Sequence, residues 1–458
     1  MSSSTTTALS RQPLREVLKG VTDPRDRRGV RHTLPAILCL AVTGILAGCR
    51  SLTAIWEHAA DLEPADLGAL GLEAGRALPS EPTIRRVLKD LDPAGLDARL
   101  TSWFFTRTGT IAGRRVIAVD GKTMRGARTG SNPAPHLLAA LDQASGVVVG
   151  QRRVSDKSNE IPALPELLAP LDLDGALITA DAMHTQTGTA EWIRSRGAHY
   201  LLTVKANQKT LRKTLKKLPW KDVPAVSSVD TGHGRRVRRT VQAVEAPEWI
   251  DLSGAAQVVR IRRTRTTAKR GSTGGNGRAK KKTTTTEVVH LICSLPMDQA
   301  QPEAVASWAR DHWAIRTAST GSETWSRART ATSCAPPTDP LVSAALRNLA
   351  ISLIRLFHGP RAPIAATTRA MAPRPRTSHR PDHPTNHLNR LCRPPAPRPP
   401  RRCMTAPTPW RCTQLLDTAH EVVKNMMPDY YKETLKAFGR HDRRSESRHC
   451  FHERSQRS

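Results

Sequence analysis

The sequence predicts an α/β protein in which a mixed sheet is flanked by helices, with an all-helical region before it and a disordered basic tail after it. Residues 10–110 carry apolar side chains at helical spacing. From residue 113 the chain alternates short apolar segments, turns and helices, which is typical of a sheet with helices packed on it. Residues 359–458 are rich in Arg, Pro and His, a composition that buries little apolar surface and predicts disorder.

The charge of the chain indicates the kind of partner it binds. The 458 residues carry a formal net charge of +31, so we expect a polyanion, and nucleic acid is a better candidate than an anionic membrane surface. The eight cysteines include no CxxC pair, which argues against a zinc module and favours reduced thiols in the cytoplasm. The N-terminal residues lack the apolar core of a secretory signal.

Two segments of the helical region are informative. Residues 34–49 are almost entirely apolar but fall short of the roughly 20 residues needed to cross a bilayer, so they predict a buried helix. In residues 80–91, Ser80 is a candidate N-cap and apolar residues recur at helical spacing beside a basic face. This second segment is either the recognition helix of a helix-turn-helix unit or, as we favour, an ordinary amphipathic helix with a solvated basic face.

The sheet region begins with a strand that ends at Asp120. Two strands joined by a turn at Ser145 and Gly146 follow, and then helices and strands alternate, which predicts a mixed sheet. The expected elements are a strand at 114–120, two strands within 136–154, a helix at 160–171, a strand ending at Asp181, a helix at 186–197 and a strand at 199–208.

A basic segment at about 206–286 interrupts this region. Its lysines and arginines alternate with Gly, Ser and Thr, and we interpret it as an irregular insertion in which residues 264–286 form a mobile loop. Residues 287–296 then return to a strand pattern and residues 302–315 to a helical one. The chain would therefore leave the sheet before the insertion and return to it afterwards.

Two aspartates, Asp120 and Asp181, each close a predicted strand and are followed by small or polar residues. Acids at the ends of two strands can meet at one edge of a sheet. Mg²⁺ is held by one or two carboxylates together with substrate phosphates, so such a pair fits phosphoryl transfer. An aspartate at a strand end is, however, more often a turn residue or a helix cap, so position alone leaves both interpretations open.

The segments around these acids resemble a known family. VIAVDGKTMRGAR, VSDKSNEIPALPELL, ITADAMHTQ and YLLTVKANQ, in this order, are similar to the catalytic core of bacterial insertion-sequence transposases of the DDE, RNase H-like class. Residues 14–55 resemble the helical domain that precedes this core in the family. ARDHWAI and AALRNLAISLIRL resemble its closing helices, so the resemblance covers about residues 12–372.

The resemblance implies a function and a domain organisation. It implies a helical transposase-associated domain at 10–110 and an RNase H-like DDE catalytic domain at 113–358 that contains the basic insertion. It also implies metal-dependent cleavage and joining of DNA, with Asp120 and Asp181 as the first two ligands of Mg²⁺ or Mn²⁺. The expected partners are double-stranded DNA, both element ends and target, and further copies of the chain.

Several polar residues near the two acids are candidates for DNA binding. Lys122 and Arg125 follow the first acid, where a cation can meet a DNA phosphate or simply belong to a solvated turn. Lys205, Asn207 and Gln208 follow a later strand and are expected at the same sheet edge. They are candidate donors to the DNA backbone.

Two further polar residues admit a structural interpretation. His184 follows Asp181 in the DAMHTQ segment and either assists at the scissile phosphate or makes a structural hydrogen bond to a neighbouring strand. Glu160 opens a predicted helix and is most simply a negative charge that favours the helix dipole.

Position 316 departs from the family pattern. In the family the segment after His-Trp continues as Ile-Glu-Asn, and that Glu is the third metal ligand, whereas here Ile315 is followed by Arg316. Deleting one G from a plausible codon string for the family-like peptide IENRLHWVRDV gives IRTASTGSET, which is residues 315–324 of this chain. We therefore hypothesise that residues 316 to about 339 are translated out of frame.

An arginine at this position is expected to weaken the site. It changes the local charge by about two units beside the metal. Glu323 is a candidate surrogate, but on a continuing helix it lies about two turns further, roughly 10 Å away. The sequence thus predicts either a transposase that is impaired in strand transfer and acts in the cytoplasm on the nucleoid, or a DNA-binding remnant without catalysis.

Overall fold

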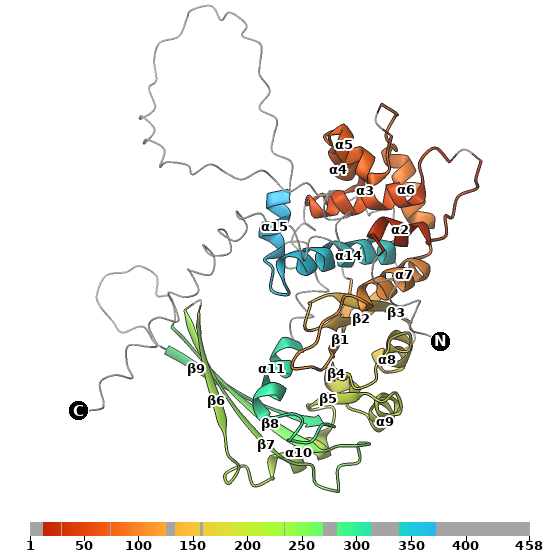
Figure 1. Cartoon of the computed structure of the whole chain (residues 1–458). Coiled ribbons are helices and arrows are strands. Elements are labelled where there is room, and N and C mark those ends of the chain that lie inside the picture. The colour runs from red at the N-terminus through yellow and green to blue at the C-terminus, as the bar shows by residue number, and fades with distance from the viewer. Residues whose placement is uncertain are drawn as a thin grey trace, which may run out of the picture.

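The computed structural model describes residues 12–28, 30–73, 75–124, 133–155, 159–232, 234–268, 282–312 and 339–371. Figure 1 shows a group of N-terminal helices with a sheet below them. The C-terminal helix α14 lies between the two, and α15 lies beside it. The predicted class, an α/β fold after an all-helical region, is confirmed. Arg125, residues 313–338 with Arg316 and Glu323, and residues 372–458 lie outside the described part of the chain.

The N-terminal helices pack around α3, which is buried on nearly every side. The segment that we predicted to be a buried helix is therefore confirmed. In α6 the buried residues are Ile84, Val87 and Leu88, while Arg86 and Lys89 are exposed, so it is amphipathic as predicted. The helices are α2 (Leu14–Lys19), α3 (Leu34–Leu46), α4 (Leu52–Ala60), α5 (Pro64–Leu70), α6 (Glu81–Asp90) and α7 (Pro93–Phe105).

The strands form one nine-stranded sheet in the order β3-β2-β1-β4-β5-β9-β8-β7-β6. β1, β2 and β3 are antiparallel neighbours, whereas β4 and β5 run parallel to β1. This half is the RNase H-like arrangement that the sequence predicts. The strands are β1 (Val116–Thr123), β2 (His136–Asp142), β3 (Val148–Val154), β4 (Leu177–Ala180), β5 (His199–Val204), β6 (Val226–Gly232), β7 (Arg235–Glu245), β8 (Gln257–Ala268) and β9 (Lys282–Cys293).

Helices cover both faces of the sheet. On one face Val119 belongs to the main core together with Leu164 of α8 and Ile193 of α9. On the other face Val116 and Leu177 pack with Trp308 of α11. The helices of this region are α8 (Glu160–Leu168), the short 3-10 helix η2 (Ala182–His184), α9 (Thr187–Ser195), α10 (Lys209–Lys216) and α11 (Pro302–His312).

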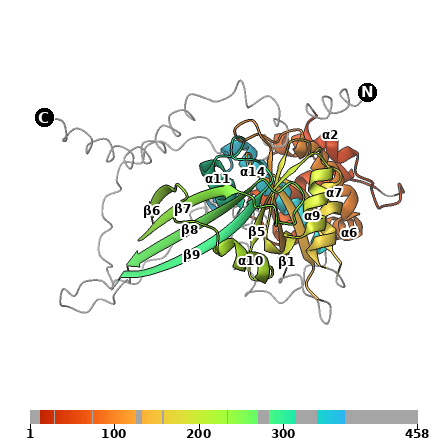
Figure 2. The same ribbon diagram turned by 90° about the horizontal axis from the view of Figure 1, so that it is seen from below.

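The basic insertion is ordered rather than irregular in its described part, so that interpretation is wrong. α10 and β6 to β9 occupy it, and Figures 1 and 2 both show these strands extending away from the N-terminal helices. Of the predicted mobile loop, residues 264–268 and 282–286 belong to β8 and β9, with Thr264 paired to Thr286. Except for the second half of β9, which the sequence predicts as a strand, these strands are largely polar and lack the apolar alternation that predicts one.

Two closing helices, α14 (Pro340–His358) and α15 (Ile364–Met371), complete the described chain. α15 lies near the start of the segment 359–458 that was predicted to be mostly disordered, so the part of it that the structure describes is helical. α14 is long and apolar enough to cross a membrane, but most of it is buried. Ser352 accepts a hydrogen bond from the Val148 amide and Arg355 donates to the Gly146 carbonyl, so α14 is a core helix tied to the sheet.

Candidate active site

Asp120, within β1, and Asp181, directly after β4, lie side by side where these two parallel strands stop pairing, and β1 continues to Thr123 rather than ending at Asp120 as predicted. β1 and β4 are paired with Val119 beside Ala180, and each aspartate is the next residue in its chain segment. Neighbouring strands are about 4.8 Å apart, so the two side chains start from adjacent positions. Alternation along the strands directs both to the face that carries Thr179, which is the face covered by α11.

The two aspartates differ in environment. Asp120 is buried, with 8% of the residue exposed, whereas the Asp181 side chain is 30% exposed. Asp181 Oδ1 accepts hydrogen bonds from the Ala182 amide at 2.8 Å and from Lys205 Nζ at 2.7 Å. Asp181 therefore caps η2 while it pairs with a cation, and any divalent ion at this position competes with Lys205 for the carboxylate.

The predicted DNA-binding residues after β5 gather around the turn that follows Asp181. Asn207 Nδ2 donates to the Ala182 carbonyl at 2.7 Å, and Gln208 Nε2 donates to the Thr185 carbonyl at 2.8 Å. Their amide groups thus fix the backbone of η2. Lys122, on β1, shares the face of Asp120 by strand alternation and is partly exposed.

Glu160 connects the two aspartate-bearing segments from the other face of the sheet. Its Oε1 lies 2.7 Å from His136 Nε2, and its Oε2 lies 3.4 Å from His184 Nε2. His136 Nδ1 in turn lies 2.9 Å from Thr123 Oγ1, at the end of β1. Burial would raise the pKa of Glu160, but hydrogen bonds from the two histidines outweigh it and hold this pKa below the ordinary value.

His184 is fully buried, so its side chain lies in the protein interior rather than at a DNA surface. Its Nε2 lies 3.4 Å from Glu160 Oε2, so this contact is to α8 and not to a neighbouring strand. The sequence does not predict this network. The only signal in it is that His136 and Glu160 are polar residues at the starts of elements that are otherwise mainly apolar.

α11 leads toward the same site. Its last residue, His312, is buried, and its Nδ1 lies 2.9 Å from Thr179 Oγ1. Gln143 donates to the Trp308 carbonyl, which ties α11 to the strand face that carries the two aspartates. Thr179 stands two residues before Asp181, so the described part of the chain leaves α11 close to the acids, with position 316 beyond it.

The donor set fits a divalent ion only in part. Two neighbouring carboxylates suit Mg²⁺ when substrate phosphates and water complete its shell. Across the described ranges, no group of three or more His, Cys, Asp or Glu side chains is placed to hold a metal. Asp120 and Asp181 are thus an incomplete site on their own.

A strongly basic surface lies on the extended strands. Cross-strand pairing puts Arg236, Arg238 and Arg262 on one face, together with Thr264 and Thr266, and all three arginines are exposed. The strand residues on this face include no acid. The opposite face carries Asp230 and Glu287, which form ion pairs with Arg239 and Arg263.

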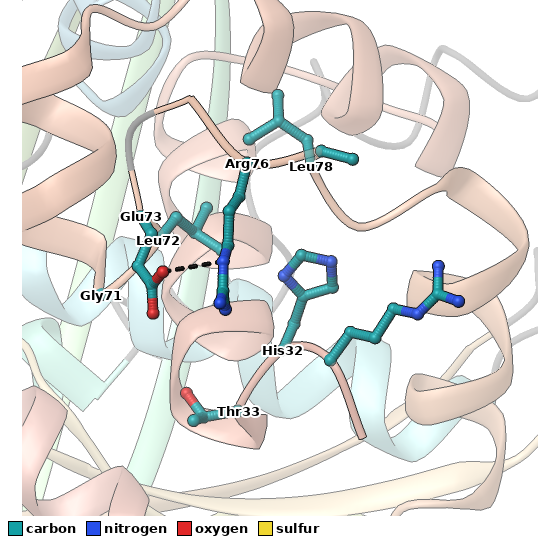
Figure 3. A pocket seen from close by; sticks show the side chains of 9 residues that line it. His32, Thr33, Gly71, Leu72, Glu73, Arg76 and Leu78 are labelled. Carbon is teal, nitrogen blue, oxygen red and sulfur yellow. Dashed lines mark ion pairs between the residues drawn. The ribbon is translucent and has the colours of Figure 1, made fainter. Parts of the chain in front are cut away.

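A cavity of about 70 Å³ lies in the N-terminal helical region, between the segments that precede α3 and follow α5 (Figure 3). His32, Arg31 and Arg76 line it, and Arg76 pairs with Glu73 at 2.9 Å. Burial, and then the charges of nearby arginines, lowers the pKa of His32. The cavity contributes no residue to the site around Asp120.

Two family models match the chain. Residues 15–104 match the model described as DDE_Tnp_1-associated, and residues 111–315 match the Transposase DDE domain. The second match ends at Ile315, immediately before Arg316.

Similar proteins bear related names. "Putative transposase YncI" of Escherichia coli O157:H7 is 32% identical over 53% of this chain and 64% of its own length. "H repeat-associated putative transposase YbfD" of E. coli K12 is 31% identical over 52% of this chain and 97% of its own length. The chain covers 65% of "Putative protein YbfL". A piggyBac transposase synaptic complex with hairpin DNA matches at a TM-score of 0.37 and 12% identity, over 80% of this chain and 78% of that one.

Proposed function

Because this chain belongs to the DDE transposase family of insertion sequences, we propose that it binds the ends of its element and that its fold is built to cut and join DNA by metal-dependent phosphoryl transfer. The observation that supports this most is the adjacency of Asp120 and Asp181 on parallel strands within the DDE domain. In this proposal both are catalytic residues and ligands of Mg²⁺ or Mn²⁺.

A bound divalent ion would supply Lewis-acid stabilisation of the charge that develops at the reacting phosphate. The chain's own residues form the binding site for this ion. Asp120 and Asp181 present carboxylate oxygens at the same sheet edge, and Lys205 compensates the charge of Asp181 until the ion arrives. Asn207 and Gln208 hold the turn after Asp181, so their first contribution is to position that carboxylate.

DNA contact is proposed at the sheet edge and on the basic strand extension. Lys122, Arg125 and Lys205 are the candidate phosphate contacts beside the acids. The acid-free face with Arg236, Arg238 and Arg262 offers exposed guanidinium groups among hydroxyls, and both kinds of donor suit phosphate oxygens. We propose that the protein works as an oligomer on paired element ends, associated with the nucleoid in the cytoplasm.

The second candidate function is DNA binding without catalysis, and a specific observation favours it. The family match stops just before Arg316, where the third acid is expected. A cation there opposes a metal at the neighbouring carboxylates. Glu323 is a surrogate only if the chain after α11 brings it back to the site. An out-of-frame segment from residue 316 agrees with this end point.

A nicking assay on element-end DNA with Mg²⁺ or Mn²⁺ separates the two functions. We expect the full chain to bind the DNA and to nick it far more slowly than a variant in which the family-like segment IENRLHWVRDV replaces residues 315–325. Asp120→Asn in the restored variant should abolish nicking. Nicking by the unmodified chain at the restored rate would refute the impairment, and no binding by either protein would refute the proposed function.

A further inference from the structure

Four polar side chains form a connected chain behind the two aspartates. Thr123 contacts His136, His136 contacts Glu160, and Glu160 contacts His184, at 2.9, 2.7 and 3.4 Å. Each comes from a different element: β1, β2, α8 and η2. Glu160 contacts both histidines, each through a different carboxylate oxygen, so it joins the β1–β2 side of this polar network to η2.

Glu160 lies on the opposite side of the sheet from the acids. A Cβ placed on Gly121 would meet Glu160 Oε1 at 2.0 Å, so the carboxylate occupies the space where a side chain at position 121 would stand. Successive strand residues point to opposite faces, so Glu160 approaches the face away from Asp120. It is therefore not the missing third ligand, because the sheet separates it from the metal face.

The polar network reaches both aspartates through short stretches of backbone. Gly121 directly follows Asp120, and Thr123 ends the same strand. His184 closes η2, the helix that Asp181 caps through the Ala182 amide. A shift of Glu160 would thus move the end of β1 and the turn after β4 relative to each other.

His184 depends on this contact. Its ring is fully buried, and its Nδ1 has no hydrogen-bond partner among the residues that the structure describes. The ring therefore hydrogen-bonds through Nε2 to Glu160. Because a carboxylate can only accept a hydrogen bond, Nε2 carries a proton. Asn207, which follows β5, donates a hydrogen bond to the Ala182 carbonyl of η2. The short helix is thus bonded to Asn207 at its start and to Glu160 at its end.

We propose that Glu160 is a positioning residue that sets the spacing of Asp120 and Asp181 for a shared divalent ion, an inference that rests on the proposed function. Partners that orient metal ligands from behind commonly change metal affinity by about tenfold or more when they are replaced. Glu160→Gln keeps the shape but removes the negative charge and one acceptor oxygen. The Glu160→Gln substitution should therefore increase the mobility of residues 120–123 and 182–185 without leaving a cavity in the core.

The test compares Glu160→Gln with Glu166→Gln in the full chain. Glu166 lies on the same helix, is half exposed and pairs only at the surface with Arg152, so it controls for the loss of a charge on α8. Mn²⁺ binding is measured by electron paramagnetic resonance, and amide hydrogen exchange is measured at residues 120–123 and 182–185. Thermal denaturation of each variant reports overall stability.

For Glu160→Gln we expect an approximately tenfold loss of Mn²⁺ affinity and faster exchange in both segments, with a melting temperature close to that of Glu166→Gln. Unchanged affinity and unchanged exchange overturn the inference, and so does faster exchange in only one of the two segments. If the parent chain shows no Mn²⁺ binding that Asp120→Asn removes, the metal proposal fails, and the exchange data alone then decide the role of Glu160.

Discussion

At the scale of a single residue, position 121 of β1 has no room for a side chain. Its backbone is not left-handed, so the restriction comes from space: the Glu160 carboxylate stands where a Cβ would be. An alanine there must displace Glu160 from His136 and His184 or shift the strand, and overpacking of this kind costs about 1–3 kcal/mol. The requirement for glycine in the DGKT segment thus follows from a residue on α8.

We predict that Gly121→Ala lowers the free energy of unfolding by about 1–3 kcal/mol in the parent chain and by much less in a Glu160→Ala background. The shorter side chain makes room for the new methyl group, so the two changes should be strongly coupled. Urea unfolding of the two single variants and the double variant measures this. Gly188→Ala, in α9 with nothing within 4 Å, is the control and should cost little. Equal costs in both backgrounds would contradict the contact.

Asp120 and Asp181 can be predicted from the sequence because each follows an apolar run, and neighbouring parallel strands bring such positions together. The strand that was predicted to end at Asp120 continues to Thr123, because residues 120–123 still pair with β2. Glu160 and His136 cannot be assigned in this way. Their contact joins the start of a helix to the start of a strand across a face that exists only after folding. Lys205 was predicted near the site, but its ion pair with Asp181 depends on the β4 and β5 register.

Among the elements, β9 carries a buried histidine that should make stability depend on pH. His290 is 2% exposed, and its ring lies 5.8 Å from that of Trp220. Burial, and then the charges of Arg260, Lys216 and Arg212, lowers the pKa of His290 to about 4. In the unfolded chain this residue takes up a proton near its ordinary value of 6.5, whereas in the folded chain it stays neutral.

The unfolded state therefore binds more protons between pH 6.5 and about 4, so the free energy of unfolding should fall as the pH drops through this window. We predict that His290→Phe flattens this part of the profile. Urea unfolding at intervals between pH 7 and 4 checks it, with His58→Phe as a second buried histidine for comparison. Parallel profiles for the parent chain and His290→Phe would contradict the assignment.

The strand extension explains the largest disagreement between sequence and structure. The outer parts of β7 and β8 are rich in arginine and that of β9 in threonine, and long backbone registers hold these parts together. β6 is exposed along its whole length. A pattern based on apolar periodicity cannot detect strands of this kind. The positions of β1 to β5 along the chain could be predicted because those strands are mainly apolar and buried.

At the scale of the whole molecule, we predict that the basic extension supplies much of the salt-dependent DNA affinity. Replacing Arg236, Arg238 and Arg262 together by Gln should weaken binding and reduce the slope of log affinity against log salt by about 3. Fluorescence anisotropy on double-stranded DNA between low and moderate salt measures the slope. Arg152→Gln on β3 together with Arg196→Gln at the end of α9 should change it little. If the slope is unaltered in the triple variant, these strands do not contact DNA and the prediction is wrong.

The adjacency of Asp120 and Asp181, where β1 and β4 stop pairing, is the feature on which the proposed chemistry depends. Calorimetric titration of the full chain with Mn²⁺ tests it most directly, with Asp120→Asn, Asp181→Asn and, as a control, Asp230→Asn on the distal strand β6. We predict one saturable site that is lost in each of the first two variants and kept in the control. Equal binding by the parent chain and both active-site variants would contradict the account.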